Sequence, residues 1–459
     1  MPNPSTRPAG PHSYSGLVAT TTTAAAGGRA RALLAPTSPR NTELGLLGLV
    51  FLVTVAAYVL ATLGRTASIP ANIIPFLAFL LTLLLIAHLA TRRFAPNATP
   101  VMLPLAGFLN GIGYVFIARL DSHLAGLQAT WTAIGVAGYV LTLAFVRRIQ
   151  LLERYRYLIA TAGVVLLLMP LAPGVGERIN GARLWVRLGP LSFQPVELAK
   201  IGLAVFFASY LVEKRELLAN PTSRVGNVLL PDPRPFGPLL LMWGLSMLVM
   251  TAERDVGFSL LIFVLFISML WISTGRATYL LVSLGLFVLG AGVMSVLLSQ
   301  VHERITVWLN PWPYASGIGY QAIQALYAMG SGGVAGTGLG LGRPTLIPVV
   351  ASDYIFAGLG EELGLVGTTI IVAAFVLLIT SGLRTAIRAR SDFAKLLTAG
   401  LTAVLGFQAF FIMAGVLRLL PVTGVTLPFV AYGGSSLVAN YILIALIVRV
   451  SDEAAPVVS

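Results

Sequence analysis

The sequence contains no cysteine and four histidines, which lie far apart along the chain. The absence of cysteine excludes disulfide bonds, thiolate catalysis and metal or haem sites built on cysteine. Scattered histidines do not make the closely spaced pairs that are typical of metal-binding segments. We therefore expect neither thiol chemistry nor a histidine-built metal centre.

Charged residues are also scarce. They make up 10% of the 459 residues while 57% are hydrophobic, whereas soluble domains carry about 25% charged residues. Windows of roughly 18 or more mostly apolar residues indicate membrane helices, since about 20 residues cross the hydrocarbon core. The sequence therefore predicts an all-α polytopic membrane protein with about twelve transmembrane helices. Their predicted ranges are 44–63, 72–90, 101–118, 129–146, 157–171, 196–212, 236–251, 256–273, 279–298, 365–383, 396–417 and 424–448.

The formal net charge of +13 is explained better by membrane topology than by nucleic-acid binding. Cytoplasmic loops of membrane proteins retain Lys and Arg. With the N-terminus placed in the cytoplasm, roughly two thirds of the 30 Lys and Arg residues fall on the cytoplasmic side. We therefore predict a multi-pass protein with both termini in the cytoplasm, whose basic turns contact anionic membrane lipids and which binds no nucleic acid.

The predicted helices leave two terminal tails and two long external segments, besides the turns. Residues 1–43, rich in Ser, Thr, Pro, Ala and Gly, predict a disordered cytoplasmic tail, and residues 449–459 form a second, short cytoplasmic tail. The other two segments, 173–195 and 299–364, are extracytoplasmic. Connections longer than about 15 residues are uncommon unless they are functional, so we look for a site in these two. No convincing internal repeat is present, which argues against an inverted-repeat transporter.

The long extracytoplasmic segment contains a glycine run, with glycines at 330, 332, 333, 336, 338, 340 and 342. Glycine permits positive φ and close backbone approach, so the run could cradle a phosphate or could form tight irregular turns. It lacks the Gly-Lys-Ser/Thr ending of a Walker loop. The sequence leaves both interpretations open.

Asp353 follows the glycine run and precedes a predicted membrane helix, among apolar residues. A partly desolvated carboxylate has a raised pKa and can accept a proton from a hydroxyl group. The alternative is a helix N-cap, for which Ser352 and Asp353 are both suitable residues. Glu361 and Glu362 lie near the start of the same helix, where negative charge suits the helix dipole, so a structural role accounts for at least one of them.

Ionisable residues also fall within predicted membrane helices. Glu197 and Lys200 are three residues apart and share a helical face. Such groups are costly in a membrane and usually face a cavity or a partner, so a functional role and an internal ion pair both remain open. The run Glu253-Arg254-Asp255 at an external helix junction could neutralise itself or bind a headgroup. Helix breakers between Pro421 and Ser436 are tolerated only beside protein or a cavity, and the last helix is expected to be broken at a cavity wall.

Together these motifs resemble the SEDS family, which includes the RodA, FtsW and SpoVE proteins of bacterial shape, division and sporulation. The similarity covers residues 101–448, a ten-helix core that contains the segment 299–364. Residues 44–91 then form an additional N-terminal helix pair, as in the twelve-helix RodA-like proteins of actinobacteria, which favours the elongation branch. The motifs are Gln194-Pro195-x-Glu197 with Lys200, Asp353-Tyr354-Ile355-Phe356 followed by Glu361-Glu362-Leu363-Gly364, and Pro428-Phe429-x-x-Tyr432-Gly433-Gly434-Ser435-Ser436.

The chain departs from the family pattern in three places. Val196 stands where the family often has Ser, and Ala431 stands where a Ser usually precedes Tyr-Gly-Gly. The run from Glu253 to Phe258 replaces Gln-Pro-Asp-Leu-Gly-Thr. None of these differences touches the motif around Asp353, so they bear on substrate contacts and regulation more than on activity.

The resemblance implies a peptidoglycan glycosyltransferase of the bacterial cytoplasmic (inner) membrane. It would polymerise lipid II into glycan strands at the outer face, with undecaprenyl pyrophosphate leaving. The family's essential loop aspartate corresponds to Asp353, which we expect to be the base for the acceptor 4-hydroxyl. Lys200, Arg304 or a divalent cation, Mg²⁺ or Mn²⁺, would neutralise the pyrophosphate. The expected substrate contacts are Lys200, Glu197, Arg183, Gln194, Arg304, Glu361, Tyr432, Ser435 and Ser436.

The resemblance also implies a partner, a class B penicillin-binding protein whose membrane helix would lie near residues 365–417. Two other functions remain open. A lipid II flippase would depend most on Glu197 and Lys200, and a non-catalytic scaffold of the divisome or elongasome would not need Asp353. The sequence assigns no metal ligands.

Overall fold

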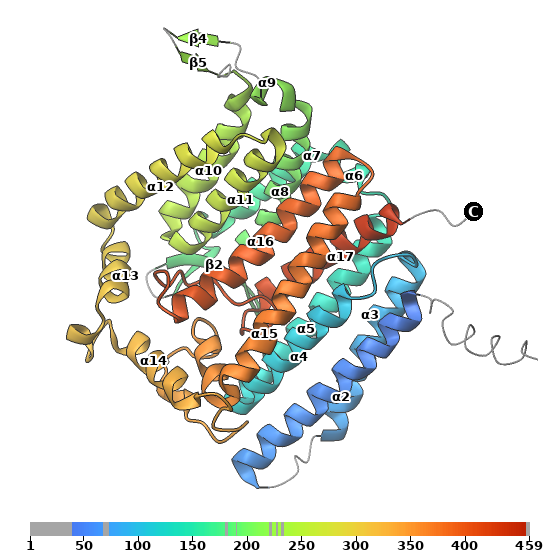
Figure 1. The fold of residues 1–459 in the computed structure, drawn as a ribbon, viewed down its shortest axis with the longest axis vertical. Coiled ribbons are helices and arrows are strands. Elements are labelled where there is room, and N and C mark those ends of the chain that lie inside the picture. Colours follow the sequence, from blue (N-terminus) through green and yellow to red (C-terminus); the bar gives the residue numbers. More distant parts are fainter. Residues whose placement is uncertain are drawn as a thin grey trace, which may run out of the picture. The chain divides into compact units, whose positions relative to one another are not determined.

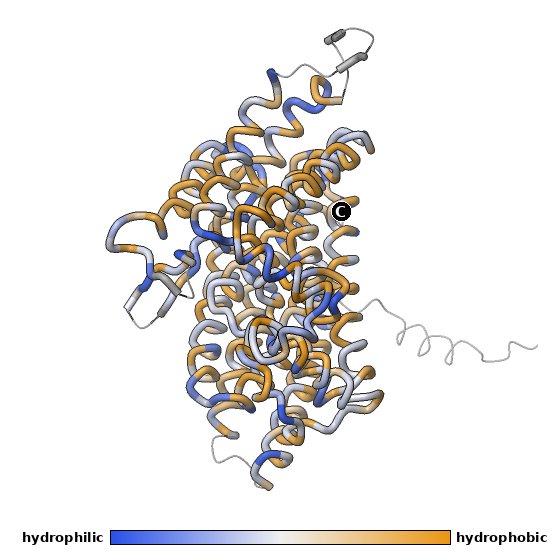
Figure 2. Tube along the Cα trace, turned by 90° about the vertical axis from the view of Figure 1, so that its left-hand side faces the viewer, coloured by the Kyte–Doolittle hydropathy of each residue, from blue (hydrophilic) through white to orange (hydrophobic). Residues whose placement is uncertain are grey.

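A computed structural model describes residues 39–67, 73–179, 182–189, 191–219, 223–225, 228–230 and 234–455. Long helices dominate this part of the chain (Figure 1), and apolar residues predominate along them (Figure 2). The long helices are α2 (Pro39–Thr66), α3 (Ile73–Phe94), α4 (Met102–Leu120), α5 (Ser122–Phe145), α7 (Arg156–Leu168), α8 (Val196–Glu213), α10 (Gly237–Glu253), α11 (Val256–Thr274), α12 (Ala277–Leu297), α15 (Ile355–Arg388), α16 (Asp392–Val416) and α17 (Gly434–Ala454).

Each of the twelve predicted helix ranges overlaps one of these helices. Within the described residues, nine helices are long and apolar enough to cross a membrane, and α7 and α10 are shorter apolar helices. Helix α8 has sufficient length but carries Glu197, Lys200 and Glu213. The structure thus confirms the polytopic helical class, and the exact number of membrane spans stays a prediction.

Short elements connect the long helices. They comprise α6 (Gln150–Arg154), η1 (Met169–Leu171), α9 (Arg215–Ala219), η2 (Arg234–Phe236), α13 (Ser299–Leu309), η3 (Trp312–Tyr314), α14 (Tyr320–Gly332) and η4 (Pro344–Leu346). The predicted segment 173–195 folds into an antiparallel sheet in the order β1-β2-β3, with β1 (Gly176–Ile179), β2 (Ala182–Leu188) and β3 (Leu191–Phe193). Strands β4 (Ser223–Val225) and β5 (Val228–Leu230) form a separate hairpin.

Helices extend into both of the predicted tails. Helix α2 already begins at Pro39, because Arg40 and Glu43 are buried and paired with each other. Residues 1–38 of the predicted N-terminal tail lie outside the described residues. At the other end α17 continues to Ala454, because Arg449 is buried and donates hydrogen bonds to the carbonyl oxygens of Leu143 and Val146.

The predicted loop 299–364 is largely helical. Helix α15 begins at Ile355, before the predicted start at Leu365, because Ile355, Phe356 and Leu359 are buried in its first turns. Gly364 then interrupts the helix with φ 64° and ψ −165°. The predicted helix thus corresponds to the second part of α15, and the motif Asp353-Tyr354 stands directly before the first part.

The predicted start of the last helix, at residue 424, was also wrong. Residues 417–433 are not helical and α17 begins at Gly434, so the helix follows an irregular segment and is not itself broken. Pro421 and Pro428 disfavour a helix here, and Gly424 and Phe429 have positive φ angles of 78° and 64°.

Helix α17 forms the centre of the bundle, since nearly all of its residues are buried. It packs mainly on α5 and also contacts α8, α15 and α16. Helix α2 packs along α4, and α3 packs on α5. We call the end of the bundle that carries α13, α14 and the start of α15 the loop end, and the end where α17 finishes the tail end (Figure 1). Asp353 directly precedes the first part of α15 and so lies at the loop end.

Candidate functional site

Asp353 lies in the turn that leads into α15 and is half-buried. Burial raises the pKa of its carboxyl group, while a hydrogen bond from Ser352 and the charge of Arg304 oppose that rise. Helix α15 is capped at Tyr354, without a side-chain hydrogen bond. Neither Ser352 nor Asp353 is therefore the N-cap, and the carboxylate of Asp353 is not committed to that structural role.

Arg304 projects from α13 towards the irregular segment 417–433. Its Nη1 donates hydrogen bonds to the carbonyl oxygens of Val422, at 3.2 Å, and Thr423, at 2.6 Å. Gly424, with φ 78°, leaves room for the guanidinium, because a Cβ there would lie 3.1 Å from Nη2. Arg304 thus holds α13 against this segment, and its positive charge acts on the carboxyl group of Asp353 by lowering its pKa.

The charge of Arg304 also acts on a second carboxylate, that of Asp255. Asp255 was not among the expected substrate contacts. It caps α11 by accepting a hydrogen bond from the backbone N–H of Phe258 at 3.0 Å. The pKa of Asp255 is raised to about 6, chiefly by burial. The carboxylate of Glu197 adds to this rise, and the charge of Arg304 opposes it. Its Oδ2 is buried and has no hydrogen-bond partner among the described residues. One signal in the sequence could have identified Asp255. It is the aspartate that the run from Glu253 to Phe258 has in common with the family pattern Gln-Pro-Asp-Leu-Gly-Thr.

Lys200 and Glu197 form a buried ion pair on α8, with 2.5 Å between Nζ and Oε2. Nζ of Lys200 also donates to Oε1 of Gln408, on α16, at 2.8 Å. The amide nitrogen of Gln408 in turn donates to the carbonyl oxygen of Thr426 and the hydroxyl of Ser436. This polar network joins α8, α16 and α17, and it adjoins Asp255 through Glu197.

Three other predicted substrate contacts lie close to these groups. The backbone N–H of Gln194 donates to the hydroxyl of Ser435 at 2.7 Å. The backbone N–H of Tyr432 donates to the carbonyl oxygen of Ala351 at 2.8 Å, two residues before Asp353. Burial raises the pKa of the Tyr432 phenol. These bonds fix the segment 417–433 and the start of α17 beside the Asp353 turn.

Two predicted contacts lie apart from this group. Arg183 is in β2 and donates to the carbonyl oxygen of Leu171 at 3.5 Å. Glu361 is buried in α15, where Oε1 accepts a hydrogen bond from the backbone N–H of Arg343 at 2.6 Å. No hydrogen bond or ion pair within the described ranges joins either residue to Asp353, and their substrate contact stays a prediction.

The glycine run begins in the last turn of α14, and its remaining glycines lie in turns or irregular backbone. The N–H groups of Gly338 and Gly340 are bonded to α15, so these two are not free to cradle a phosphate. The N–H groups of Thr337, Gly338, Gly340 and Arg343 donate to the backbone or carboxylate oxygens of Glu361 and Glu362. In the part of the chain that the structure describes, no three His, Asp or Glu side chains gather as metal ligands, and no residue is assigned to Mg²⁺ or Mn²⁺.

Comparison with known proteins gives concordant results. The family model described as cell cycle protein, which covers FtsW, RodA and SpoVE, matches residues 113–455. The chain is 41% identical to the peptidoglycan glycosyltransferase RodA of Mycobacterium tuberculosis over 441 residues, which is 93% of this chain and 94% of that protein. It is 40% identical to the RodA protein of Mycobacterium leprae, over 90% of this chain and 91% of that protein.

Two solved structures are also similar. One is a chain from work on how a peptidoglycan synthase complex coordinates polymerization and crosslinking, with 27% identity and a TM-score of 0.62. The match covers 76% of this chain and 96% of that chain. Another is a mutant of the rod shape determining protein RodA of Thermus thermophilus, with 25% identity, a TM-score of 0.56 and coverage of 77% of this chain and 97% of that chain.

Proposed function

The chain belongs to the family of FtsW, RodA and SpoVE proteins, and from that premise we propose that it is a peptidoglycan glycosyltransferase that polymerises lipid II. The observation that carries the proposal is the half-buried carboxylate of Asp353 at the loop end, close enough to the Arg304 guanidinium for that charge to lower its pKa. The distribution of Lys and Arg supports a loop end that faces outward from the cytoplasmic membrane. There it would meet lipid II headgroups.

In this mechanism Asp353 removes the proton from the 4-hydroxyl of the acceptor sugar. The hydroxyl oxygen forms a bond to the anomeric carbon of the donor, and the bond from that carbon to the pyrophosphate oxygen breaks. The pyrophosphate leaves with the bonding electrons, so a general acid is not needed. The raised pKa of Asp353 brings the carboxylate closer to the hydroxyl in basicity.

Arg304 is better placed than Lys200 to neutralise the leaving pyrophosphate. Lys200 is buried, with 1% of its surface exposed, and is bonded to Glu197 and Gln408. Arg304 is at the loop end and uses Nη1 for backbone carbonyls, which leaves its other nitrogens to face an anion. A divalent cation, Mg²⁺ or Mn²⁺, could share this role.

The experiment is polymerisation of labelled lipid II by the purified full-length protein together with a class B penicillin-binding protein, with and without a chelator. The expected product is glycan strands in which the sugar units of several lipid II molecules are joined. If the protein moves lipid II across vesicle membranes and forms no strands, it is a flippase. A chain that does neither and still supports growth of a deletion strain is a scaffold. Lost polymerisation in the chelator sample would establish the cation requirement.

We further propose that the partner is a class B penicillin-binding protein and that the role is cell elongation. A synthase complex of polymerization and crosslinking is among the structural relatives, and the mycobacterial relatives carry the RodA name. The second part of α15 exposes Leu365, Val366 and Ile370. This apolar face is suited to the partner's membrane helix, and replacement of these residues by Ala should weaken co-purification of the partner.

A further inference from the structure

We propose that helix α2 of the additional N-terminal pair positions the turn that contains Asp353, by holding the glycine segment, residues 336–342, against the first part of α15. This inference rests on the proposed function, because it concerns the placement of Asp353. The family model begins at residue 113, so α2 lies outside the segment that it matches. The proposal therefore gives the added helix a function.

Helix α2 touches the glycine segment backbone to backbone. A Cβ on Gly64 would lie 2.2 Å from the carbonyl oxygen of Leu339, and a Cβ on Gly340 would lie 2.3 Å from that of Ala61. Separations this short require glycine on both sides of the contact. Gly340 also has φ 82°. The last turns of α2 and the glycine segment therefore fit together without an intervening side chain.

The glycine segment in turn is hydrogen-bonded to the first part of α15. The N–H of Gly340 donates to Oε2 of Glu362 at 3.0 Å, and the N–H of Gly338 donates to the Glu362 carbonyl oxygen at 3.0 Å. Arg119 of α4 pairs with the same carboxylate at 2.5 Å. Glu362 is 1% exposed, so these bonds are shielded from water. A displacement of the glycine segment would move the first part of α15, which starts two residues after Asp353.

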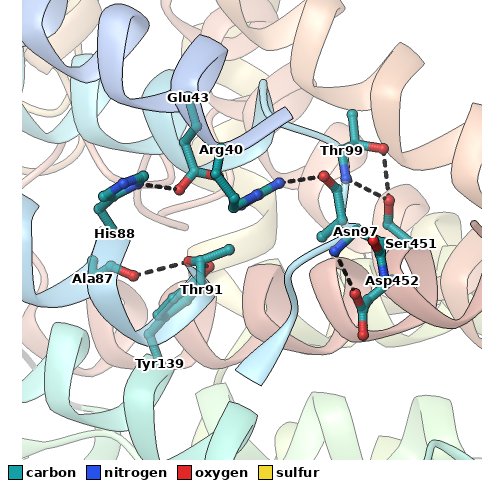
Figure 3. Close-up of polar contacts among 11 residues, drawn as sticks. Arg40, Glu43, Ala87, His88, Thr91, Asn97, Thr99, Tyr139, Ser451 and Asp452 are labelled. Atoms are coloured by element: carbon teal, nitrogen blue, oxygen red, sulfur yellow. Dashed lines mark hydrogen bonds and ion pairs between the residues drawn. The ribbon is translucent and has the colours of Figure 1, made fainter. Parts of the chain in front are cut away.

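The opposite end of α2 is anchored to the core at the tail end (Figure 3). Arg40 pairs with Glu43 and donates to the carbonyl oxygen of Ala98, and Oε1 of Glu43 lies 2.8 Å from Nδ1 of His88 on α3. The adjoining Asn97 N–H donates to Asp452, near the end of α17, at 2.8 Å. Because both of its ends are fixed, α2 can resist movement of the loop that it holds.

The test uses two matched pairs of substitutions in the full-length chain. Gly64→Ala introduces a methyl group into the contact with Leu339, whereas Gly48→Ala places the same group on the same helix in open space. Gly340→Ala clashes with α2, whereas Gly338→Ala has comparable positive-φ strain without touching α2. The readouts are lipid II polymerisation, amide hydrogen exchange of residues 336–364 and thermal unfolding.

We expect Gly64→Ala to polymerise about tenfold more slowly than Gly48→Ala, since small misplacements of reacting groups are costly. Exchange should accelerate in residues 336–364 while the unfolding temperature matches that of Gly48→Ala. Gly64→Ala and Gly340→Ala should also be non-additive, because they disturb one contact. Equal exchange and equal rates in Gly64→Ala and Gly48→Ala would overturn the proposal. If Gly64→Ala does not fold, the Gly340 and Gly338 pair decides in the same way. If the parent chain does not polymerise lipid II, the proposed function fails, and the exchange data still test the contact.

Discussion

At the scale of single residues, the guanidinium of Arg304 affects the pKa of two carboxyl groups. Arg304 lowers the pKa of both Asp353 and Asp255, each of which is raised by burial. Without that charge, burial would leave the carboxylates more protonated near neutral pH. Arg304 therefore favours the ionised form of Asp353, while burial keeps the pKa of its carboxyl group above the ordinary value.

This arrangement predicts a pH effect. Asp353 accepts a proton only when it is ionised, so polymerisation should slow as the pH falls through its pKa. Arg304→Gln removes the charge that lowers this pKa. The acidic limb of the pH–rate profile should then move to higher pH, in addition to any overall loss of rate.

Arg418→Gln is the matched control. Arg418 also joins segment 417–433 to α13, by hydrogen bonds from Nη2 to the carbonyl oxygens of Trp308, at 2.8 Å, and Leu309, at 3.1 Å, but it does not contribute to the pKa of Asp353. Its profile should keep the acidic limb of the parent protein. If the acidic limb of the pH–rate profile does not move in Arg304→Gln, the group that titrates is not Asp353.

At the scale of elements, the buried network around Lys200 connects three helices. Its ion pair joins Glu197 and Lys200 within α8, and Gln408 and Ser436 extend it to α16 and α17. The polar groups of this network are paired with one another inside the bundle. That arrangement favours the internal ion pair among the two roles that the sequence leaves open.

Lys200→Met should therefore destabilise the protein, because it leaves the Glu197 carboxylate buried without its partner. The expected cost is about 3–5 kcal/mol of unfolding free energy. The double variant Glu197→Gln/Lys200→Met should recover most of that loss. Denaturation of the purified variants in detergent measures both. A stable Lys200→Met protein with lost lipid II binding would instead assign Lys200 to the substrate.

The elements show what the sequence could predict and where it failed. Long apolar runs located the twelve helices, because burial in lipid leaves a strong compositional signal. The first part of α15 was missed, since its Ile355, Phe356 and Leu359 are apolar positions in a helix too short to stand out beside the membrane span. The segment 417–433 was assigned to a helix because its apolar residues outweighed Pro421 and Gly424 in that window.

At the scale of the whole molecule, the motifs that are distant in sequence meet at one end of the bundle. Gln194, Asp353 and Tyr432 come from three separate segments. The N–H of Gln194 donates to Ser435, three residues after Tyr432, and the N–H of Tyr432 donates to Ala351, two residues before Asp353. The motif order predicted their common function, but no local pattern predicted the electrostatic effect of Arg304 on Asp255 or the contact of α2 with the glycine segment. Such contacts depend on how the helices pack.

The absence of cysteine allows a direct test of the membrane orientation. Ala315, near α13, and Glu216, in α9, are both exposed, so a single cysteine at either position would be accessible to a reagent. A membrane-impermeant maleimide should label Ala315→Cys in intact cells and Glu216→Cys only after permeabilisation. The opposite pattern would place Asp353 in the cytoplasm and exclude it from the outer surface.

The central claim is that Asp353 accepts a proton from the acceptor sugar during glycan polymerisation. Its most direct test is the rate of lipid II polymerisation by purified Asp353→Asn, which keeps the shape of the side chain but removes the base. The account predicts a rate about 10²- to 10⁴-fold lower than that of the parent protein, with unchanged co-purification of the partner. Polymerisation by Asp353→Asn at the parental rate would contradict it.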